Sequence, residues 1–321
     1  MEQLVPHLLC ATQQAAIAAA AWVGRGAAVR ADGAAVSAMR AALMTTPGRG
    51  TVVIGEGEKD AAPMLHDGEM VGTGVGAAFD LAVDPLENTT ACAHGADGAI
   101  TVLAAAPQGV LWTTPGWYLD KLVVGPAAVG AIDIAAPVAA NLAAIAHRLD
   151  KPVEALTAVV LAKPRHGELV AELRSAGARV SLIPGGDVLG ALRALLPDGG
   201  ADLLIGVGGA AEGVITACSV RLLGGDMQAR LAPQSDVEAE RVSGAGQRAG
   251  QILGLDDLVA PGPCAFLATG VTGGDLLQGP LPLAWGVRTH SLLLSPLHPG
   301  LTVEETHDPL TVVAHPELAH A

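Results

Sequence analysis

Two short apolar runs in the first third of the chain each end in a turn rich in acidic residues. Residues 51–54 run into the turn GEGEKD (55–60), and residues 79–83 run into the turn DPLENTT (84–90). Glycine and proline end strands, so each acidic cluster is expected at the carboxyl end of a strand, where open α/β sheets bind their ligands. Carboxylates this close repel one another unless a cation lies between them, which favours a hard divalent metal ion.

Each acidic turn taken alone is explained equally well as a solvated turn. Two features favour a site. Glu56 lies between Gly55 and Gly57, which permit tight backbone geometry, and Pro85 restricts the backbone after Asp84. Two such turns in one chain therefore favour one shared metal site over two unrelated surface turns.

Hydrophobic periodicity predicts the elements that surround these turns. Apolar residues at helical spacing indicate helices over residues 3–23 and 34–43, with Asp32 at the N-cap position of the second. Capping alone is the competing explanation for Asp32. Further apolar runs predict a hairpin of strands at 99–105 and 110–112, a strand at 122–124 and a helix at 138–149.

The second half repeats a strand–loop–helix pattern three times, which is typical of a parallel α/β layer. Pro152 is the best candidate for a boundary, so we expect an N-terminal subdomain of residues 1–150 and a C-terminal one of 151–321. The predicted strands are 156–161, 179–183 and 201–206, followed by helices at 168–176, 187–196 and from Val214; residues 233–263 suggest a helix with loops and 264–269 a strand.

Three loops in this half have distinct chemistry. Lys163-Pro164-Arg165-His166 places two cations between a strand and a helix, which suits a phosphate but also fits an ordinary basic loop. Pro184-Gly185-Gly186-Asp187 suits an anion or a sugar hydroxyl, or is a plain turn. Residues 206–211 match a dinucleotide fingerprint only weakly. The rival interpretation makes Glu212, at a helix N-terminus, a further metal ligand.

Composition and charge exclude several classes of function. The chain of 321 residues has a formal net charge of -14, which argues against nucleic acid or an anionic membrane surface as partner. An anionic substrate remains compatible, because bound cations reverse the local charge. The four cysteines are scattered, so neither disulfides nor a zinc site is expected. Without a signal peptide or a membrane-length apolar run, we expect a cytoplasmic protein.

Several stretches together resemble class II fructose-1,6-bisphosphatase. They follow that family's order and extend over roughly residues 10–278. These stretches are ADGAAV (31–36), GEGE (55–58), APML (62–65), DPLE (84–87), AKPRH (162–166), GGAAEG (208–213), GGDM (224–227) and ATGVT (268–272).

The resemblance implies a fold, an activity and a set of site residues. The fold would be the layered αβαβα sugar-phosphatase fold with two subdomains, related to inositol monophosphatases, and the activity Mn²⁺- or Mg²⁺-dependent removal of the 1-phosphate of fructose 1,6-bisphosphate in gluconeogenesis. The implied metal ligands are Asp32, Glu56, Asp84, Glu87 and Glu212, and the implied catalytic residues are Asp32, Glu56, Asp84, Thr89 and Glu212. The implied substrate contacts are Glu87, Asn88, Thr89, Tyr118, Lys163, Pro164, Arg165, Gly185, Gly186, Asp187 and Gly209. A homodimer or homotetramer is expected.

The chain departs from the family pattern at polar positions around the substrate. The family has an Asp-Lys pair where Ala27 and Ala28 stand, and Gly and often Arg at the positions of Asn88 and Thr90. It has Asp at the position of Gly185, Lys at that of Gly273, and a more basic C-terminal part, whereas Arg288 is the only Lys or Arg after Gly279. Because all five presumed metal ligands are present, we expect the chemistry to remain and the substrate preference to be affected.

Three other functions remain open at this stage. Sedoheptulose 1,7-bisphosphate or another sugar or inositol phosphate is an alternative substrate. A sugar-phosphate-binding protein with weak catalysis belongs to a different class, and the missing cations favour it. A nicotinamide-dependent oxidoreductase rests on residues 206–211 alone.

Overall fold

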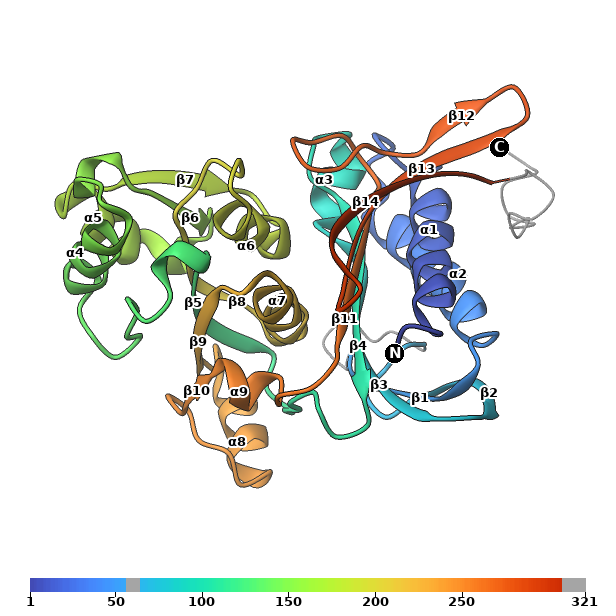
Figure 1. Ribbon diagram of the computed structural model, residues 1–321, viewed down its shortest axis with the longest axis horizontal. Helices are drawn as coiled ribbons and strands as arrows, with labels where there is room; N and C mark the ends of the chain where they lie inside the picture. Colours follow the sequence, from blue (N-terminus) through green and yellow to red (C-terminus); the bar gives the residue numbers. More distant parts are fainter. Residues whose placement is uncertain (56–63, 308–321) are drawn as a thin grey trace.

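Two β-sheets and the helices packed on them build the molecule in alternating layers (Figure 1). The computed structural model describes residues 1–55 and 64–307. Within these residues the first sheet has eight strands, in the order β12-β13-β11-β4-β3-β1-β2 with β14 paired to β13, and the second has six, in the order β10-β9-β5-β8-β6-β7. The predicted α/β class with layered sheets is confirmed.

The first half of the molecule is built from both ends of the chain. Its N-terminal elements are α1 (Val5–Ala20), α2 (Ala28–Leu43), β1 (Gly48–Ile54), β2 (Met70–Val75), β3 (Ala78–Glu87), α3 (Thr89–His94) and β4 (Ile100–Pro107). Its C-terminal elements are β11 (Ala265–Gly270), β12 (Leu281–Leu283), β13 (Gly286–Ser295) and β14 (His298–His307).

The second half is one continuous stretch of chain. Its strands are β5 (Tyr118–Val124), β6 (Thr157–Leu161), β7 (Arg179–Ile183), β8 (Leu203–Gly209), β9 (Asp226–Leu231) and β10 (Ile252–Gly254). Its helices are α4 (Val138–Leu149), α5 (Gly167–Ser175), α6 (Asp187–Leu195), α7 (Ala210–Leu223), α8 (Asp236–Gly244) and α9 (Leu255–Leu258), with short 3₁₀ turns at Pro126–Ala128, Val153–Ala155 and Pro164–His166.

Strands buried on both faces explain the continuous apolar runs of the sequence. In β4, Val102 and Ala104 face the core shared by the two sheets, whereas Leu103 and Ala105 face the core under α1 and α2. In β6, Val159 belongs to the shared core, and its neighbours belong to the outer core of the second half. Alternate side chains point to opposite faces of a strand, so each run must be apolar throughout.

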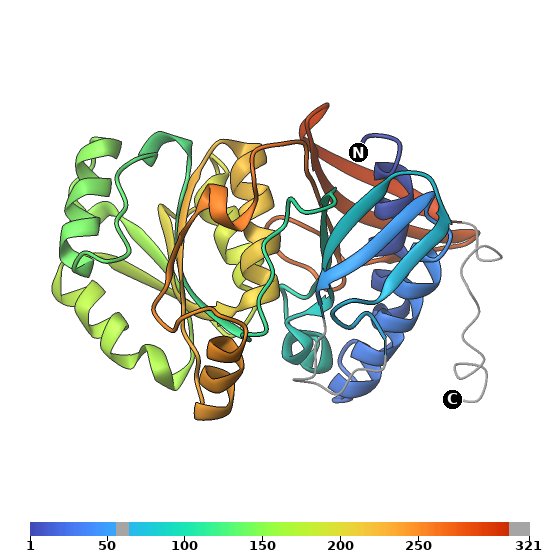
Figure 2. The same cartoon turned by 90° about the horizontal axis from the view of Figure 1, so that it is seen from below.

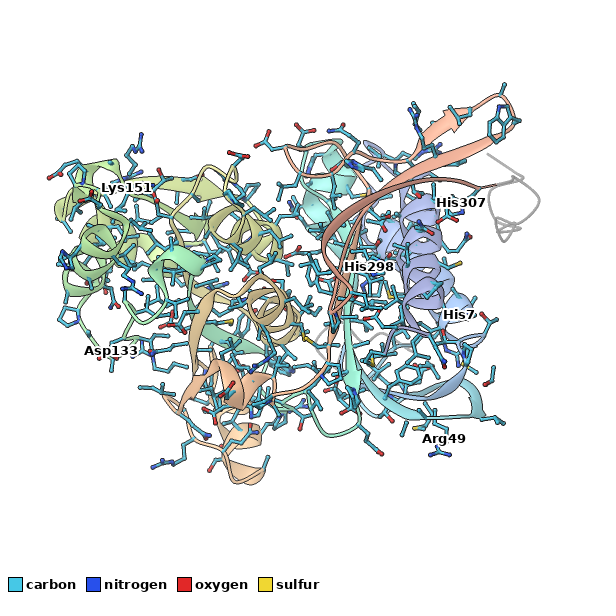
Figure 3. All side chains as sticks on the ribbon, viewed as in Figure 1. His7, Arg49, Asp133, Lys151, His298 and His307 are labelled. Carbon is cyan, nitrogen blue, oxygen red and sulfur yellow. The ribbon has the colours of Figure 1, made fainter. Side chains whose placement is uncertain are left out.

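Helix α7 lies between the two sheets and belongs to the core that joins them (Figures 1 and 2). Its small buried residues, such as Ala217 and Cys218, permit close packing against both. Helices α1 and α2 cover the other face of the first sheet, and α4 and α5 cover the other face of the second. Charged side chains such as Arg49 and Lys151 lie at the outer surfaces (Figure 3).

The chain crosses between the halves twice, and the two crossings pair with each other. The Trp112 amide donates to Leu258 O at 2.9 Å, and the Ala260 amide donates to Val110 O at 2.9 Å. This antiparallel bridge between Leu111 and Val259 replaces the strand predicted at 110–112, so the predicted hairpin is wrong. Strand β4 pairs instead with β3 and β11.

Other predictions of the elements fare differently. The units β6–α5, β7–α6 and β8–α7 were predicted, and β6 runs parallel to both β7 and β8. Helix α2 begins at Ala28, because the alanines before Asp32 favour helix, so the N-cap prediction for Asp32 is wrong.

Sheet membership does not follow a division at residue 150, since β5 joins the second sheet and β11–β14 return to the first. The division itself stays a prediction. Among the described helices, none has the length and apolarity needed to cross a membrane.

Glu238 of α8 fixes the start of β5. Its buried carboxylate accepts from the amides of Trp117 at 2.6 Å, Tyr118 at 2.9 Å and Gln234 at 2.7 Å. Ser235 caps the same helix by accepting from the Glu238 amide. The strand therefore begins at Tyr118, four residues earlier than the apolar pattern predicted.

We predict that Glu238→Ala lowers the free energy of unfolding by about 2–4 kcal/mol, because three amides lose a charged acceptor. Chemical denaturation monitored by circular dichroism measures the change. Glu240→Ala is the matched control, since Glu240 is exposed on the same helix and should change stability little. Equal effects of the two substitutions would contradict the assignment of Glu238 as the anchor.

Candidate active site

One cleft of about 1170 Å³ collects almost all the described residues that the sequence singled out. The first half contributes residues of α2, the end of β3 and the start of α3. The second half contributes the start of β5, the loop after β6, the start of α6 and the turn from β8 to α7. Pro164 belongs to the loop after β6 but does not line the cleft.

Four of the five predicted metal ligands line this cleft. Asp32 lies in α2, Asp84 and Glu87 at the end of β3, and Glu212 in the first turn of α7. Glu56, the fifth, lies outside the described residues. Apart from residues 56–63 and 308–321, no group of three or more His, Cys, Asp or Glu side chains forms a ready metal site.

Glu87 is a deeply buried carboxylate of this group. It is 4% exposed, and its Oε1 accepts from the Val188 amide at 2.9 Å. Its Oε2 is buried and finds no hydrogen-bond partner in the described part of the chain. Burial, then the Asp187 carboxylate and more weakly Glu212, raise the pKa of Glu87 well above its ordinary value. A buried carboxylate with an unused oxygen among like charges suits a bound cation.

Asp84 and Thr89 complete the acidic turn. Asp84 is half-buried, and its Oδ1 accepts from the Leu86 amide at 3.0 Å, at the irregular end of β3 where the register with β4 shifts between Asp84 and Glu87. Thr89 is the first residue of α3, and its half-buried side chain lines the cleft next to this turn. Thr90 follows it in the helix and is exposed.

Lys121 of β5 and Asp187 of α6 form a buried ion pair behind the cleft. The Lys121 Nζ lies 2.5 Å from Asp187 Oδ2 and donates to Gly209 O at 3.1 Å. Gly208 and Gly209 leave room for two carboxylates. A Cβ added to Gly208 would overlap the Asp187 carboxylate, and a Cβ added to Gly209 would overlap the Glu212 carboxylate. The Gly-Gly of the turn is therefore required by close side-chain approach.

The basic loop after β6 is fixed on both sides. The Arg165 Nη2 donates to Val207 O at 2.8 Å, and its guanidinium lies 5.2 Å from the Tyr118 ring centroid. His166 is buried, with Nδ1 2.7 Å from Leu161 O and Nε2 accepting from the Val207 amide at 2.8 Å. Lys163 is exposed at the cleft. The loop thus presents two cations from a backbone anchored by a structural histidine.

Asn88 and Gly185, two departures from the family pattern, lie against each other. Asn88 adopts left-handed geometry, with φ 64°, and its Nδ2 donates to Gly98 O at 3.2 Å. A Cβ added to Gly185 would lie 2.6 Å from Asn88 Oδ1. Asn88 therefore occupies the space that a side chain at position 185 would need. Gly186, also with positive φ, precedes α6 in the same wall.

The cleft contains residues that sequence reasoning missed. Arg241 of α8 lines it, with its guanidinium 5.1 Å from the Trp117 ring centroid. Asp67 lines it as well, and its Oδ1 accepts from the Gly55 amide at 2.9 Å. Arg241 lies in the stretch 233–263, for which the sequence suggested only a helix with loops, and Asp67 lies in an ordinary turn, so no local pattern marks either one.

Known proteins with related sequences match most of this chain. The family model described as bacterial fructose-1,6-bisphosphatase, glpX-encoded, matches residues 2–301. Fructose-1,6-bisphosphatase 1 class 2 of Escherichia coli (strain K12) is 46% identical over 281 residues, which cover 84% of each chain. Fructose-1,6-bisphosphatase class 2 of Shigella flexneri matches with the same identity and coverage.

We predict that Gly185→Ala destabilises the protein by about 1–2 kcal/mol, because its Cβ must displace the Asn88 side chain. In an Asn88→Gly background this penalty should disappear, since glycine accepts the left-handed geometry and leaves the space empty. A double-mutant cycle of unfolding free energies measures the coupling. Gly33→Ala is the control for a methyl group added without a clash: nothing lies within 4 Å of its Cβ, so in helix α2 it should stabilise the protein by about 0.5–1 kcal/mol. Additive effects at 88 and 185 would contradict the proposed contact.

Proposed function

Since this chain belongs to the family of bacterial, glpX-encoded fructose-1,6-bisphosphatases, we propose that it hydrolyses fructose 1,6-bisphosphate to fructose 6-phosphate and phosphate. This is a step of gluconeogenesis. The observation that carries the proposal is a single cleft that combines the carboxylates Asp84, Glu87 and Glu212 with the cations Lys163 and Arg165. A bisphosphate needs such a combination, with one phosphate at the reaction centre and the other held by fixed positive charge.

A divalent cation fits the donor set of the cleft. Every proposed ligand is a carboxylate, and the buried Oε2 of Glu87, which has no hydrogen-bond partner among residues 1–55 and 64–307, offers an acceptor. We propose that Asp32, Glu56, Asp84, Glu87 and Glu212 hold Mn²⁺ or Mg²⁺. When bound, the metal would polarise the phosphoryl oxygens and lower the pKa of a water molecule.

The remaining groups would bind and orient the substrate. Lys163 and Arg165 would hold the distal phosphate, with the Tyr118 ring beside Arg165. Asp187 and the Gly186 and Gly209 backbone would receive the sugar hydroxyls, and Thr89 would orient the attacking water or the scissile phosphate. In the reaction, a water oxygen bonds to phosphorus, the ester P–O bond breaks, and the sugar oxygen leaves with a proton.

The departures in this chain concern substrate preference more than chemistry. Asn88 in place of Gly and the absence of a side chain at Gly185 reshape the wall near α6. Gly273 supplies no positive charge where the family has Lys. A Cβ added to Gly273 would lie 3.1 Å from Asp97 Oδ1. Sedoheptulose 1,7-bisphosphate, one carbon longer, is therefore a second candidate substrate. A homodimer or homotetramer stays a prediction.

We predict that the purified protein releases phosphate from fructose 1,6-bisphosphate with Mn²⁺ or Mg²⁺, and that Glu212→Gln reduces turnover at least about a hundredfold, since a metal ligand would be lost. Phosphate release is measured for fructose 1,6-bisphosphate, sedoheptulose 1,7-bisphosphate and inositol 1-phosphate. Release from the second alone would change the substrate assignment. Tight binding of the first without release would favour a binding protein.

Glu87 gives a second prediction, on stability without metal. Because its folded pKa is raised, its stabilising contribution is complete below its ordinary pKa of 4.5 and is lost as the pH rises through the raised value. At pH 8, Glu87→Gln should therefore raise the melting temperature of the metal-free protein by a few degrees. The Val188 amide keeps an acceptor in this variant.

Added Mn²⁺ should reverse this order, because the wild-type protein gains the binding free energy and the variant gains less. Differential scanning fluorimetry with chelator or Mn²⁺ reads both effects. Glu172→Gln, at an exposed position of α5, is the control. A Mn²⁺ shift that is equal in the wild-type and Glu87→Gln proteins would sink the ligand assignment of Glu87.

A further inference from the structure

Lys121 is one of the most deeply buried long side chains of the protein. It lies in the middle of β5, and its side chain is 1% exposed. Lysine is rarely buried unless its ammonium group is paired, because removal of the charge from water is unfavourable. A lysine in such a position therefore needs a physical explanation.

The ammonium group of Lys121 connects two segments that line the cleft. It pairs with Asp187 Oδ2 at the start of α6 and donates to Gly209 O at the turn from β8 to α7. Lys121 lies on the strand next to β8, with Gly206 as its register partner. One side chain on a rigid central strand thus sets the position of the start of α6 relative to the β8–α7 turn.

The surrounding backbone is shaped to admit the pair. A Cβ added to Gly208 would lie 2.8 Å from Lys121 Nζ and would overlap the Asp187 carboxylate. The Lys121 stem passes over α7, since its Cδ lies 3.5 Å from where a Cβ of Gly213 would stand. Two glycines therefore leave the space in which the lysine reaches its partners.

Stability alone does not explain a buried ion pair. Removal of two charges from water offsets much of their attraction, and apolar residues of similar volume often fold as well or better. What an ion pair does provide is a defined position for each partner. Here one partner, Asp187, lines the cleft, and the other acceptor, Gly209 O, belongs to a residue that lines it too.

We propose that Lys121 is a positioning residue for the sugar-binding wall of the active site. Its ammonium group binds both Asp187 Oδ2 and the Gly209 carbonyl oxygen. These two contacts fix the distance between Asp187 and the Gly209 backbone, both of which would face the substrate. The proposal rests on the proposed function, because it assumes that these two residues contact the sugar. Lys121 itself lies behind the cleft and touches no substrate.

The test is a cycle of Lys121→Met, Asp187→Asn and their double variant, each assayed for KM and kcat with fructose 1,6-bisphosphate. Lys121→Met should raise KM about tenfold or more, with a smaller change in kcat. In the double variant neither Lys121 nor Asp187 leaves a charge unpaired by loss of the other, so its melting temperature should recover. Its KM should exceed that of Asp187→Asn by a smaller factor than Lys121→Met exceeds the wild type, because only the contact with the Gly209 carbonyl is then still lost.

Lys151→Met is the matched control. Lys151 forms a pair of similar length, 2.6 Å, with Asp202, but its side chain is 46% exposed on the outer surface (Figure 3). It should leave KM unchanged. A purely structural Lys121 would lower the melting temperature of Lys121→Met without altering KM of the folded enzyme. That result, or a KM increase by the same full factor in the Asp187→Asn background, would overturn the proposal.

Failure of the proposed function can be recognised separately. A wild-type protein that releases no phosphate from fructose 1,6-bisphosphate would refute the function. Calorimetric binding of fructose 6-phosphate then tests the positioning role, with the wild-type affinity expected to fall about tenfold or more in Lys121→Met. Unchanged affinity, or no binding to the wild-type protein, would refute that role as well. If Lys121→Met does not fold, the double variant compared with Asp187→Asn supplies the decisive KM: a higher KM in the double variant is expected from the lost contact with Gly209 O, and an equal KM would overturn the proposal.

Discussion

Repulsion among carboxylates in one cleft is the constraint on which the rest of this structure depends. Glu87, Asp187 and Glu212 come from three elements, and the effect of the last two on the pKa of Glu87 is unfavourable for its ionised form. The fold offsets this repulsion with the Val188 amide and the buried Lys121 ammonium group. The two sheets and helix α7 hold these groups in place. A cation bound between the carboxylates would neutralise the repulsion that remains among them.

The predictable parts of the fold are those where one local pattern determines the outcome. The apolar runs of β4 and β6 and the helix α4 could be placed from sequence, because burial on both faces of a strand or on one helical face leaves a clear pattern. The acidic residues Asp84 and Glu87 were expected in a turn after Val83, but β3 continues to Glu87, so this strand end was predicted four residues too early. Strand β5 was recognised only in part, because Asp120 and Lys121 interrupt its apolar pattern. From sequence, one member of a buried ion pair is interpreted as a polar surface residue, because its partner is distant along the chain.

The site shows the same division between local and long-range information. Motifs indicated Asp84, Glu87 and Glu212 as members of one cleft, and each lines it. Arg241 and Asp67 could not be predicted, because only tertiary contact brings α8 and the turn before β2 to the cleft. The relation between Asn88 and Gly185 was likewise hidden. In sequence they are two unrelated departures, whereas in space the Asn88 side chain occupies the volume that a side chain at position 185 would need.

The strand order of the first sheet has a consequence for how the chain is made. Strand β4 is paired on one side by β3 and on the other by β11, and more than 150 residues separate β4 from β11. During synthesis on the ribosome, the second half is therefore complete while β4 still presents an open edge. Because domains fold as their residues emerge, the half that begins the chain becomes the last to close. A nascent chain halted before Ala265 would carry a finished second sheet beside an unfinished first one.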